Sequence, residues 1–110
     1  GHDLDVLKLP LRLDVATGSE GYTLLRGEEQ TLKPGDMMIS DQEGVISSIV
    51  YGPDQRTQIT PNTQNVIFTV YAPPGIDEQT VTEHLQHIRD NVLVFAPQAQ
   101  VKLLKVYTGK

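Results

Sequence analysis

The sequence from Leu32 to Val70 reads LKPGDMMISDQEGVISSIVYGPDQRTQITPNTQNVIFTV. It contains two apolar runs, Met37–Ile39 and Val45–Tyr51, and nearly all of a third, Val66–Tyr71, each rich in β-branched, aromatic or other apolar residues and short enough for a buried strand. Turn-forming clusters at 41–44 and 52–55 separate the runs. The stretch therefore predicts three strands joined by loops. Because polar groups project freely from loops held by packed strands, we expect any chemistry in the loop Gly52–Arg56 and in the polar tract that follows it.

The residues before this stretch also favour strands. Leu11, Leu13 and Val15 alternate with Arg12 and Asp14, which predicts a half-buried strand. Glycine-containing turns at 17–21 and 26–29 separate it from two shorter extended segments, at 22–25 and 30–32. Residues 1–8 are interpreted as a short helical turn or an entry loop. The first two-thirds of the chain is therefore expected to be β-rich.

The last third has a different period. Val81, Leu85, Ile88, Val92 and Phe95 recur at spacings of four and three, as on one face of an amphipathic helix. Either of two polar residues can cap this helix (Asp77 or Thr80), and a proline at position 97 stops it. We expect a helix over 77–94 that packs its apolar stripe on a sheet, and then a last strand over 101–107. The predicted fold class is α+β: a β-rich layered β/β/α domain of short strands with one C-terminal helix and a final strand.

Composition limits the function classes. A chain of 110 residues is expected to form a single domain, 1–110, with a modest core. It has no apolar run long enough to span a membrane, no signal-peptide pattern and no cysteine, which favours a cytoplasmic protein without disulfides or thiolate chemistry. The formal charge of -5 is unlike that of a typical nucleic-acid binder. We therefore expect weak RNA binding by this chain alone, although it can act on RNA held by another subunit.

Two groups of polar residues are candidates for a site. His84 and His87 lie three apart on the expected helix, but a zinc site needs three or four ligands, so two solvated surface histidines are the favoured interpretation. The tract from Arg56 to Asn65 carries threonine and asparagine side chains and no carboxylate. It is either a solvated loop that caps the next strand or a set of neutral hydrogen-bonding groups around an uncharged polar substrate. No metal or organic cofactor is expected.

The order of several segments resembles a known family. The segments are HDLDVL, LRLDVAT, GYTLLRGEEQTLKPGDMMISDQEGVISS, YG and TPNTQNVIF, all between residues 1 and 72. Their order and spacing resemble the editing, tRNA-binding B-three/B-four domain of the phenylalanyl-tRNA synthetase beta subunit, and most closely its free-standing homologues. The resemblance implies a layered β/β/α fold within a domain nearly twice this length. The chain is accordingly expected to be the C-terminal half of such a domain.

The resemblance also implies site residues. His2 falls on the histidine of the family's Leu-His-Ala-Phe-Asp motif, and Gly52 falls in its glycine-rich loop. Thr63–Phe68, which includes Asn65, falls on the strand that lines the family's pocket. Two positions depart from the family: Tyr51 stands among residues that are small in the family's loop, and Thr69 stands at or next to the glutamate that reads a tyrosine hydroxyl. A site that hydrogen-bonds a substrate hydroxyl discriminates only while its own polar group is present, so a preference for tyrosine is not expected here.

The activity implied by the resemblance is hydrolysis of a mischarged aminoacyl-tRNA. An ester of this kind needs a positioned water and donors for the oxyanion. We assign catalytic roles to His2, which would orient the water, and Asn65. Substrate-binding roles go to five residues, namely Tyr51, Gly52, Arg56, Thr63 and Thr69.

The sequence leaves other interpretations open. One alternative is a non-catalytic module that binds RNA or a protein and derives from the synthetase beta subunit. Another is a structural fragment that is stable because an apolar edge pairs with a second copy. The expected partners are tRNA and either a second copy of the chain or the absent N-terminal half of the domain, with no membrane contact.

Overall fold

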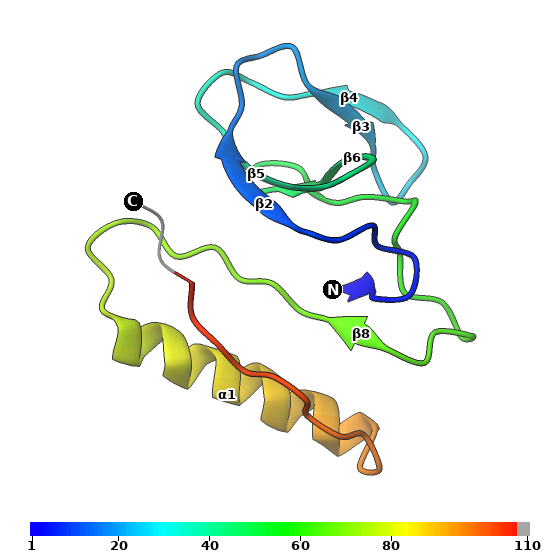
Figure 1. Cartoon of the computed structure of the whole chain (residues 1–110), viewed down its shortest axis with the longest axis vertical. Helices are drawn as coiled ribbons and strands as arrows, with labels where there is room; N and C mark the ends of the chain where they lie inside the picture. Colours follow the sequence, from blue (N-terminus) through cyan, green and yellow to red (C-terminus); the bar gives the residue numbers. More distant parts are fainter. Residues whose placement is uncertain (108–110) are drawn as a thin grey trace. The chain divides into compact units, whose positions relative to one another are not determined.

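The computed structural model describes residues 1–107 and divides into two compact units, Gly1–Thr69 and a second that begins at Val70 (Figure 1). The first is sheet-rich and the second contains one helix, so the predicted α+β class is confirmed. The strands of the first unit are β1 (His2–Asp3), β2 (Arg12–Val15), β3 (Gly21–Thr23), β4 (Glu29–Thr31), β5 (Met37–Asp41), β6 (Gly44–Ser48), β7 (Gly52–Pro53) and β8 (Val66–Ile67).

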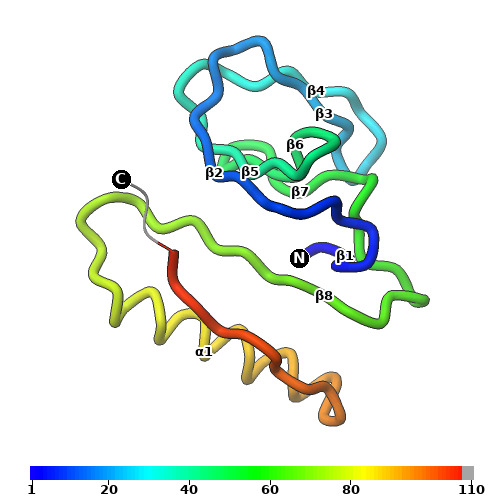
Figure 2. Tube along the Cα trace, viewed as in Figure 1, coloured from blue at the N-terminus to red at the C-terminus, as the bar shows by residue number. Residues whose placement is uncertain are grey.

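These strands form three antiparallel sheets. The largest has four strands in the order β2-β5-β6-β7, and two smaller sheets pair β3 with β4 and β1 with β8 (labelled in Figure 2). The predicted strand at 11–15 is confirmed as β2, and the two short extended segments are confirmed as β3 and β4 with boundaries shifted by one or two residues. All four residues of β2 are exposed, so it is not half-buried as the alternation had predicted.

The β5–β6 hairpin is the element that the stretch Leu32–Val70 predicts most accurately. Asp41 pairs with Gly44 across its turn, and the Asp41 Oδ1 atom accepts hydrogen bonds from the backbone N–H groups of Glu43 and Gly44. The second strand ends earlier than predicted, at Ser48, and residues 49–51 form a turn. Gly52 then reverses the chain with a φ of +84°, a conformation that side chains with a Cβ rarely adopt.

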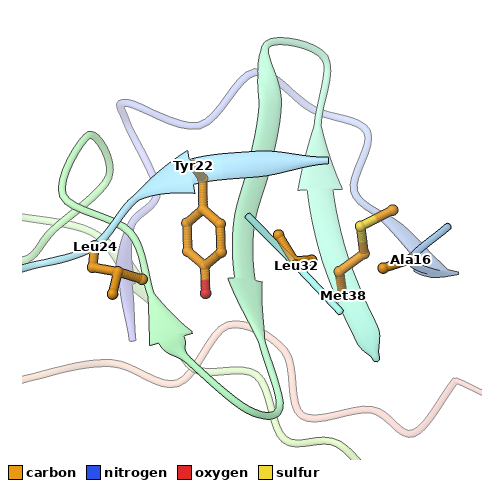
Figure 3. Close-up of a cluster of buried hydrophobic side chains, with 5 residues drawn as sticks. All are labelled: Ala16, Tyr22, Leu24, Leu32 and Met38. Atoms are coloured by element: carbon orange, nitrogen blue, oxygen red, sulfur yellow. The ribbon is translucent and has the colours of Figure 1, made fainter. Parts of the chain in front are cut away.

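A hydrophobic core lies between the β3–β4 pair and the four-stranded sheet. Its buried members are Ala16, Tyr22, Leu24, Leu32 and Met38, and Figure 3 draws their side chains. Val45 and Tyr51 are partly buried and pack against this cluster. Tyr51, to which the resemblance assigned a substrate-binding role, therefore belongs to the periphery of the core.

The third apolar run of the opening stretch differs from the prediction. Only Val66 and Ile67 form a strand, and β8 pairs with β1 in a two-stranded sheet. The pairing is short because of the length of β1: after Asp3 the chain enters a turn at residues 4–6, which leaves two residues to pair. The first residues are thus a strand followed by a turn, and not a helical turn or loop alone.

The second unit contains α1 (Glu78–Phe95). Asp77 is its N-cap, accepting a hydrogen bond from the Thr80 backbone N–H at 2.7 Å. The helix ends at Phe95, with Ala96 as its C-cap, just before the proline that was expected to stop it. The apolar stripe of α1 is half-buried at best, because no residue of the helix is fully buried.

The predicted strand over 101–107 is wrong. Figure 2 follows the chain through a turn after α1 into an extended segment that pairs with no strand among the described residues. Three of its apolar side chains are exposed, Val101 at 50%, Leu103 at 69% and Tyr107 at 73%, while Leu104 and Val106 are half-buried. Without a partner for its backbone N–H and C=O groups, an alternating sequence does not form a strand.

Candidate functional site

A buried polar network ties the start of the chain to the loop after β7. The His2 Nδ1 atom lies 2.8 Å from the Thr57 hydroxyl and 3.6 Å from the Asp54 carboxylate. Thr57 in turn donates to Asp54 through its hydroxyl, and also through its backbone N–H at 3.3 Å. The exposed fractions of His2, Thr57 and Asp54 are 1%, 0% and 2% respectively. All three residues of the network are therefore buried.

The hydrogen bonds of this network define the tautomer of His2. The Thr57 hydroxyl has one proton, and it donates that proton to the Asp54 carboxylate. The contact between Thr57 and His2 must therefore be a hydrogen bond donated by Nδ1–H of the imidazole. A chain of donors thus runs from His2 through Thr57 to Asp54, and it orients all three side chains.

Arg56 lies on the same loop and binds the β5–β6 turn. Its guanidinium forms two hydrogen bonds with Asp41, at 2.7 and 3.0 Å, and one with Glu43 at 3.1 Å. The Asp41 side chain is fully buried, and it also accepts a hydrogen bond from the Lys8 backbone N–H. Arg56 therefore fixes the position of the loop against the hairpin.

The ion pair perturbs both groups. Burial raises the pKa of the Asp41 carboxyl, but hydrogen bonds from Arg56 and from the Lys8 and Glu43 backbone N–H groups, together with the charge of Arg56, outweigh burial and lower the pKa from 3.8 to about 2. The hydrogen bond to Asp41 raises the pKa of Arg56 above its ordinary value. Both side chains are thus charged at neutral pH.

A cavity of about 210 Å³ opens beside Arg56. Its walls come from β3, from the β5–β6 hairpin and from the loop after β7. The lining residues are Gly21, Tyr22, Thr23, Glu43, Gly44, Val45, Asp54 and Arg56. Because Asp54 belongs both to this lining and to the buried network, the cavity is connected to His2 through Thr57.

Gly52 and Tyr51 lie outside the cavity lining. The Tyr22 hydroxyl donates a hydrogen bond to the Gly52 carbonyl at 2.5 Å and lies 3.1 Å from the Ser48 hydroxyl oxygen. Burial raises the pKa of Tyr22. The Tyr51 backbone N–H donates to Ser48 at 3.0 Å. These contacts hold the turn between β6 and β7.

The remaining predicted residues hold the β1–β8 segment. The Thr63 hydroxyl donates to Asp3 at 2.9 Å, and the Asn65 side-chain amide donates to Asp5 at 3.1 Å. Thr69 is half-buried and is the last residue of the first unit. None of the three is among the residues that line the cavity. Gly52 and Asn65, which the sequence places in one site, belong to different sheets or their flanks.

Several residues of this region were missed by sequence reasoning. Asp54 lies inside the loop Gly52–Arg56, where chemistry was expected, but a single aspartate next to a proline is the ordinary composition of a turn. Thr57 had been grouped with a solvated tract and is completely buried. Nothing in the sequence singles out Tyr22 or Glu43, because strands that are distant along the chain bring them to the cavity.

Neither a metal centre nor a membrane span is found in the part of the chain that the structure describes. Within 1–107, no group of three or more histidine, cysteine or acidic side chains could hold a metal ion. In the same range, α1 is not apolar enough to cross a membrane.

Comparison with known proteins assigns the family. The model of the B3/4 domain family matches residues 1–94. Over 69 residues, which are 63% of this chain, the sequence is 32% identical to the phenylalanine–tRNA ligase beta subunit of Mycoplasma pneumoniae and 30% identical to that of Mycoplasma genitalium. The matched segment spans 9% of the length of each relative. Since the family model covers most of the sequence, the chain belongs to the B3/4 domain family and resembles that domain of the synthetase beta subunit, as the order of its segments had indicated.

Proposed function

We propose that this chain is a tRNA-editing-like domain that takes the aminoacyl end of a mischarged tRNA into its cavity and hydrolyses the ester. Membership of the B3/4 family supports a link to aminoacyl-tRNA, since both similar proteins are named as tRNA ligase beta subunits. The observation that carries the proposal is the cavity of about 210 Å³, whose lining includes both Arg56 and Asp54. The site of action would be the cytoplasm, where tRNA is charged.

Hydrolysis of an aminoacyl ester needs a base for the water and a donor for the oxyanion. Asp54 would accept the proton of the attacking water, and Thr57 and His2 would hold its carboxylate in place from the buried side. The three hydrogen bonds that Arg56 makes to Asp41 and Glu43 do not exhaust the N–H donors of its guanidinium. The remaining donors would bind the carbonyl oxygen as negative charge develops on it.

In this proposal His2 is a positioning residue rather than a group that touches substrate. Its imidazole is 1% exposed and reaches the cavity through Thr57 and Asp54. Asn65 would contact a part of the substrate that lies outside the cavity, or it would only stabilise the fold, because its side-chain amide donates a hydrogen bond to Asp5. Thr63, with its hydroxyl on Asp3, would support the same segment.

The test is deacylation of a panel of mischarged tRNAs by the purified protein. We expect turnover that favours small or polar aminoacyl groups over tyrosine, because the glutamate that binds a tyrosine hydroxyl in the family is absent here: Thr69, at or next to its position, carries no carboxylate and lies outside the cavity lining. Asp54→Asn should abolish turnover, and Arg56→Lys should lower it because lysine does not reproduce the planar set of donors. The matched control is Arg26→Lys, the same change at an exposed position outside the cavity lining, and it should retain turnover. Fast, tyrosine-selective turnover would contradict the expected preference for small or polar aminoacyl groups. Activity retained in Asp54→Asn would contradict the assignment of hydrolysis to the cavity that Asp54 lines.

A second candidate function is a non-catalytic module that binds RNA or a protein. The observation that favours it is that both residues assigned to catalysis from the sequence, His2 and Asn65, have their side chains in intramolecular hydrogen bonds. Absence of turnover on every member of the panel, together with salt-dependent RNA binding, would favour this function.

A further inference from the structure

The four-stranded sheet has two edges of different character. One edge is β7, which has only two residues, Gly52 and Pro53, and proline cannot donate to a further strand. The other edge is β2, whose four residues are all exposed and which, among the strands within residues 1–107, is hydrogen-bonded to β5 alone. Leu13 and Val15 on this edge are 54% and 53% exposed. An exposed apolar edge strand is a template for pairing with another strand.

The backbone of β2 indicates which residues direct their hydrogen-bonding groups away from the sheet. The Ala16 N–H and C=O groups both bond back toward the start of β5, to Asp36 and Gly35. Because residues alternate along an antiparallel ladder, Arg12 and Asp14 also direct their backbone groups to β5, while Leu11, Leu13 and Val15 direct theirs outward. In agreement, the Val15 N–H donates to the side chain of its neighbour Asp14, at 2.9 Å, rather than to β5.

The sequence of this edge is complementary to itself in the antiparallel direction. With Leu13 opposite Leu13 of a second copy, the outward N–H and C=O groups of the two residues bond to each other. In the same register Leu11 lies opposite Val15 of the other copy, and Arg12 lies opposite Asp14 twice. Opposite charges at directly facing positions stabilise a strand pair, and like charges destabilise it. Asp14 would exchange its bond to the Val15 N–H for an ion pair with Arg12 of the second copy.

We propose that the occupant of this edge is a second copy of the chain, paired antiparallel through residues 11–15 about a two-fold axis at Leu13. A two-fold contact of this kind requires a self-complementary surface. The pattern of one basic and one acidic residue placed evenly about a central leucine meets that requirement. The charges also exclude a parallel pairing in register, which would place Arg12 against Arg12 and Asp14 against Asp14.

The experiment measures self-association by sedimentation velocity over a range of protein concentrations, with two charge reversals. In the Arg12→Asp homodimer two aspartates face each other at both charged positions, and in the Asp14→Arg homodimer two arginines do. Each reversal should raise the dissociation constant about tenfold, because two attractive pairs become repulsive. An equimolar mixture of the two variants should restore dimerisation, as a heterodimer in which one strand carries two aspartates and the other carries two arginines. The matched control is Arg26→Asp, whose side chain is 65% exposed on the β3–β4 turn and should leave association unchanged.

Three results would overturn the proposal. The first is a monomer at every concentration, with or without the charge reversals. The second is a dimer whose dissociation constant is the same in both single variants and in the mixture, which would place the contact elsewhere. The third is occupation of the edge by a different segment or protein with no self-association of the purified chain. Circular dichroism of each variant confirms that loss of the dimer does not reflect loss of the fold.

Discussion

At the scale of single residues, buried polar side chains define the candidate site more than exposed ones do. Thr57 is completely buried and joins His2 to Asp54, although its sequence neighbours are polar and typical of a loop. The carboxylate of Asp41, which is also buried, accepts hydrogen bonds from Arg56 and from three backbone N–H groups. Buried polar groups of this kind stabilise a fold when every partner is present and destabilise it when one is removed.

The first prediction concerns the Thr57 hydroxyl. Thr57→Val keeps the shape of the side chain but leaves His2 and Asp54 without their shared partner, so it should lower the free energy of unfolding by about 1–3 kcal/mol. Thr57→Ser keeps the hydroxyl and should cost less. Urea denaturation followed by circular dichroism measures both. Equal losses in the two variants would mean that packing of the methyl group, and not the hydrogen bonds, explains the effect.

The second prediction concerns the pH dependence of the Asp41–Arg56 pair. The folded-state pKa of Asp41 is about 2 against an ordinary 3.8, so the carboxylate contributes stability that is fully present above about pH 4. That contribution, about 2 kcal/mol at most, is lost as the pH falls from 3.8 through 2. Urea denaturation at several acidic pH values should show this loss in the wild type and a flatter profile in Asp41→Asn. The same slope in both proteins would contradict the assignment.

At the scale of elements, local sequence patterns predicted the helix and the strands whose hydrogen-bonding partners lie nearby in the sequence. The β5–β6 hairpin follows from two apolar runs and an Asp-Gln-Glu-Gly turn, and α1 follows from a period near 3.6 between Asp77 and a proline. The pairing of β8 with β1 joins the two ends of the first unit, and no local pattern encodes it. For the same reason the sequence placed Gly52 and Asn65 in one site, while strand pairing assigns them to different sheets or their flanks.

The site was predictable only in part. Arg56 was selected from its loop and does line the cavity, but Tyr22 and Glu43 reach the cavity from other elements. The family resemblance singled out His2, which lies on the first strand. It gave no indication that His2 is buried behind Thr57, because burial depends on how the β1 segment packs.

The third prediction concerns the core enclosed by β3–β4 and the four-stranded sheet. Leu32 is 2% exposed, so Leu32→Ala should lower the free energy of unfolding by about 2–5 kcal/mol. Leu25→Ala removes the same atoms from a side chain that is 47% exposed and should cost much less. Denaturant titration of the two variants provides the comparison, and similar losses would mean that the cluster drawn in Figure 3 is not the stabilising core.

At the scale of the whole molecule, the charge balance limits how the chain meets RNA. The formal charge of -5 disfavours contact with the phosphate backbone, on which most nucleic-acid affinity depends. We therefore predict weak tRNA binding near physiological salt, measured by fluorescence anisotropy. Tight binding that survives raised salt would contradict this expectation and would indicate a specific RNA surface.

The central claim is that the cavity beside Arg56 receives the aminoacyl end of tRNA. The most direct measurement is an NMR titration of the chain with an adenosine that carries an amide-linked amino acid in place of the ester, compared with adenosine alone. The account predicts chemical-shift changes at the cavity residues Thr23, Gly44 and Arg56 with the aminoacyl compound and none there with adenosine. Changes confined to Thr63–Phe68, or no change at saturating ligand, would contradict the claim.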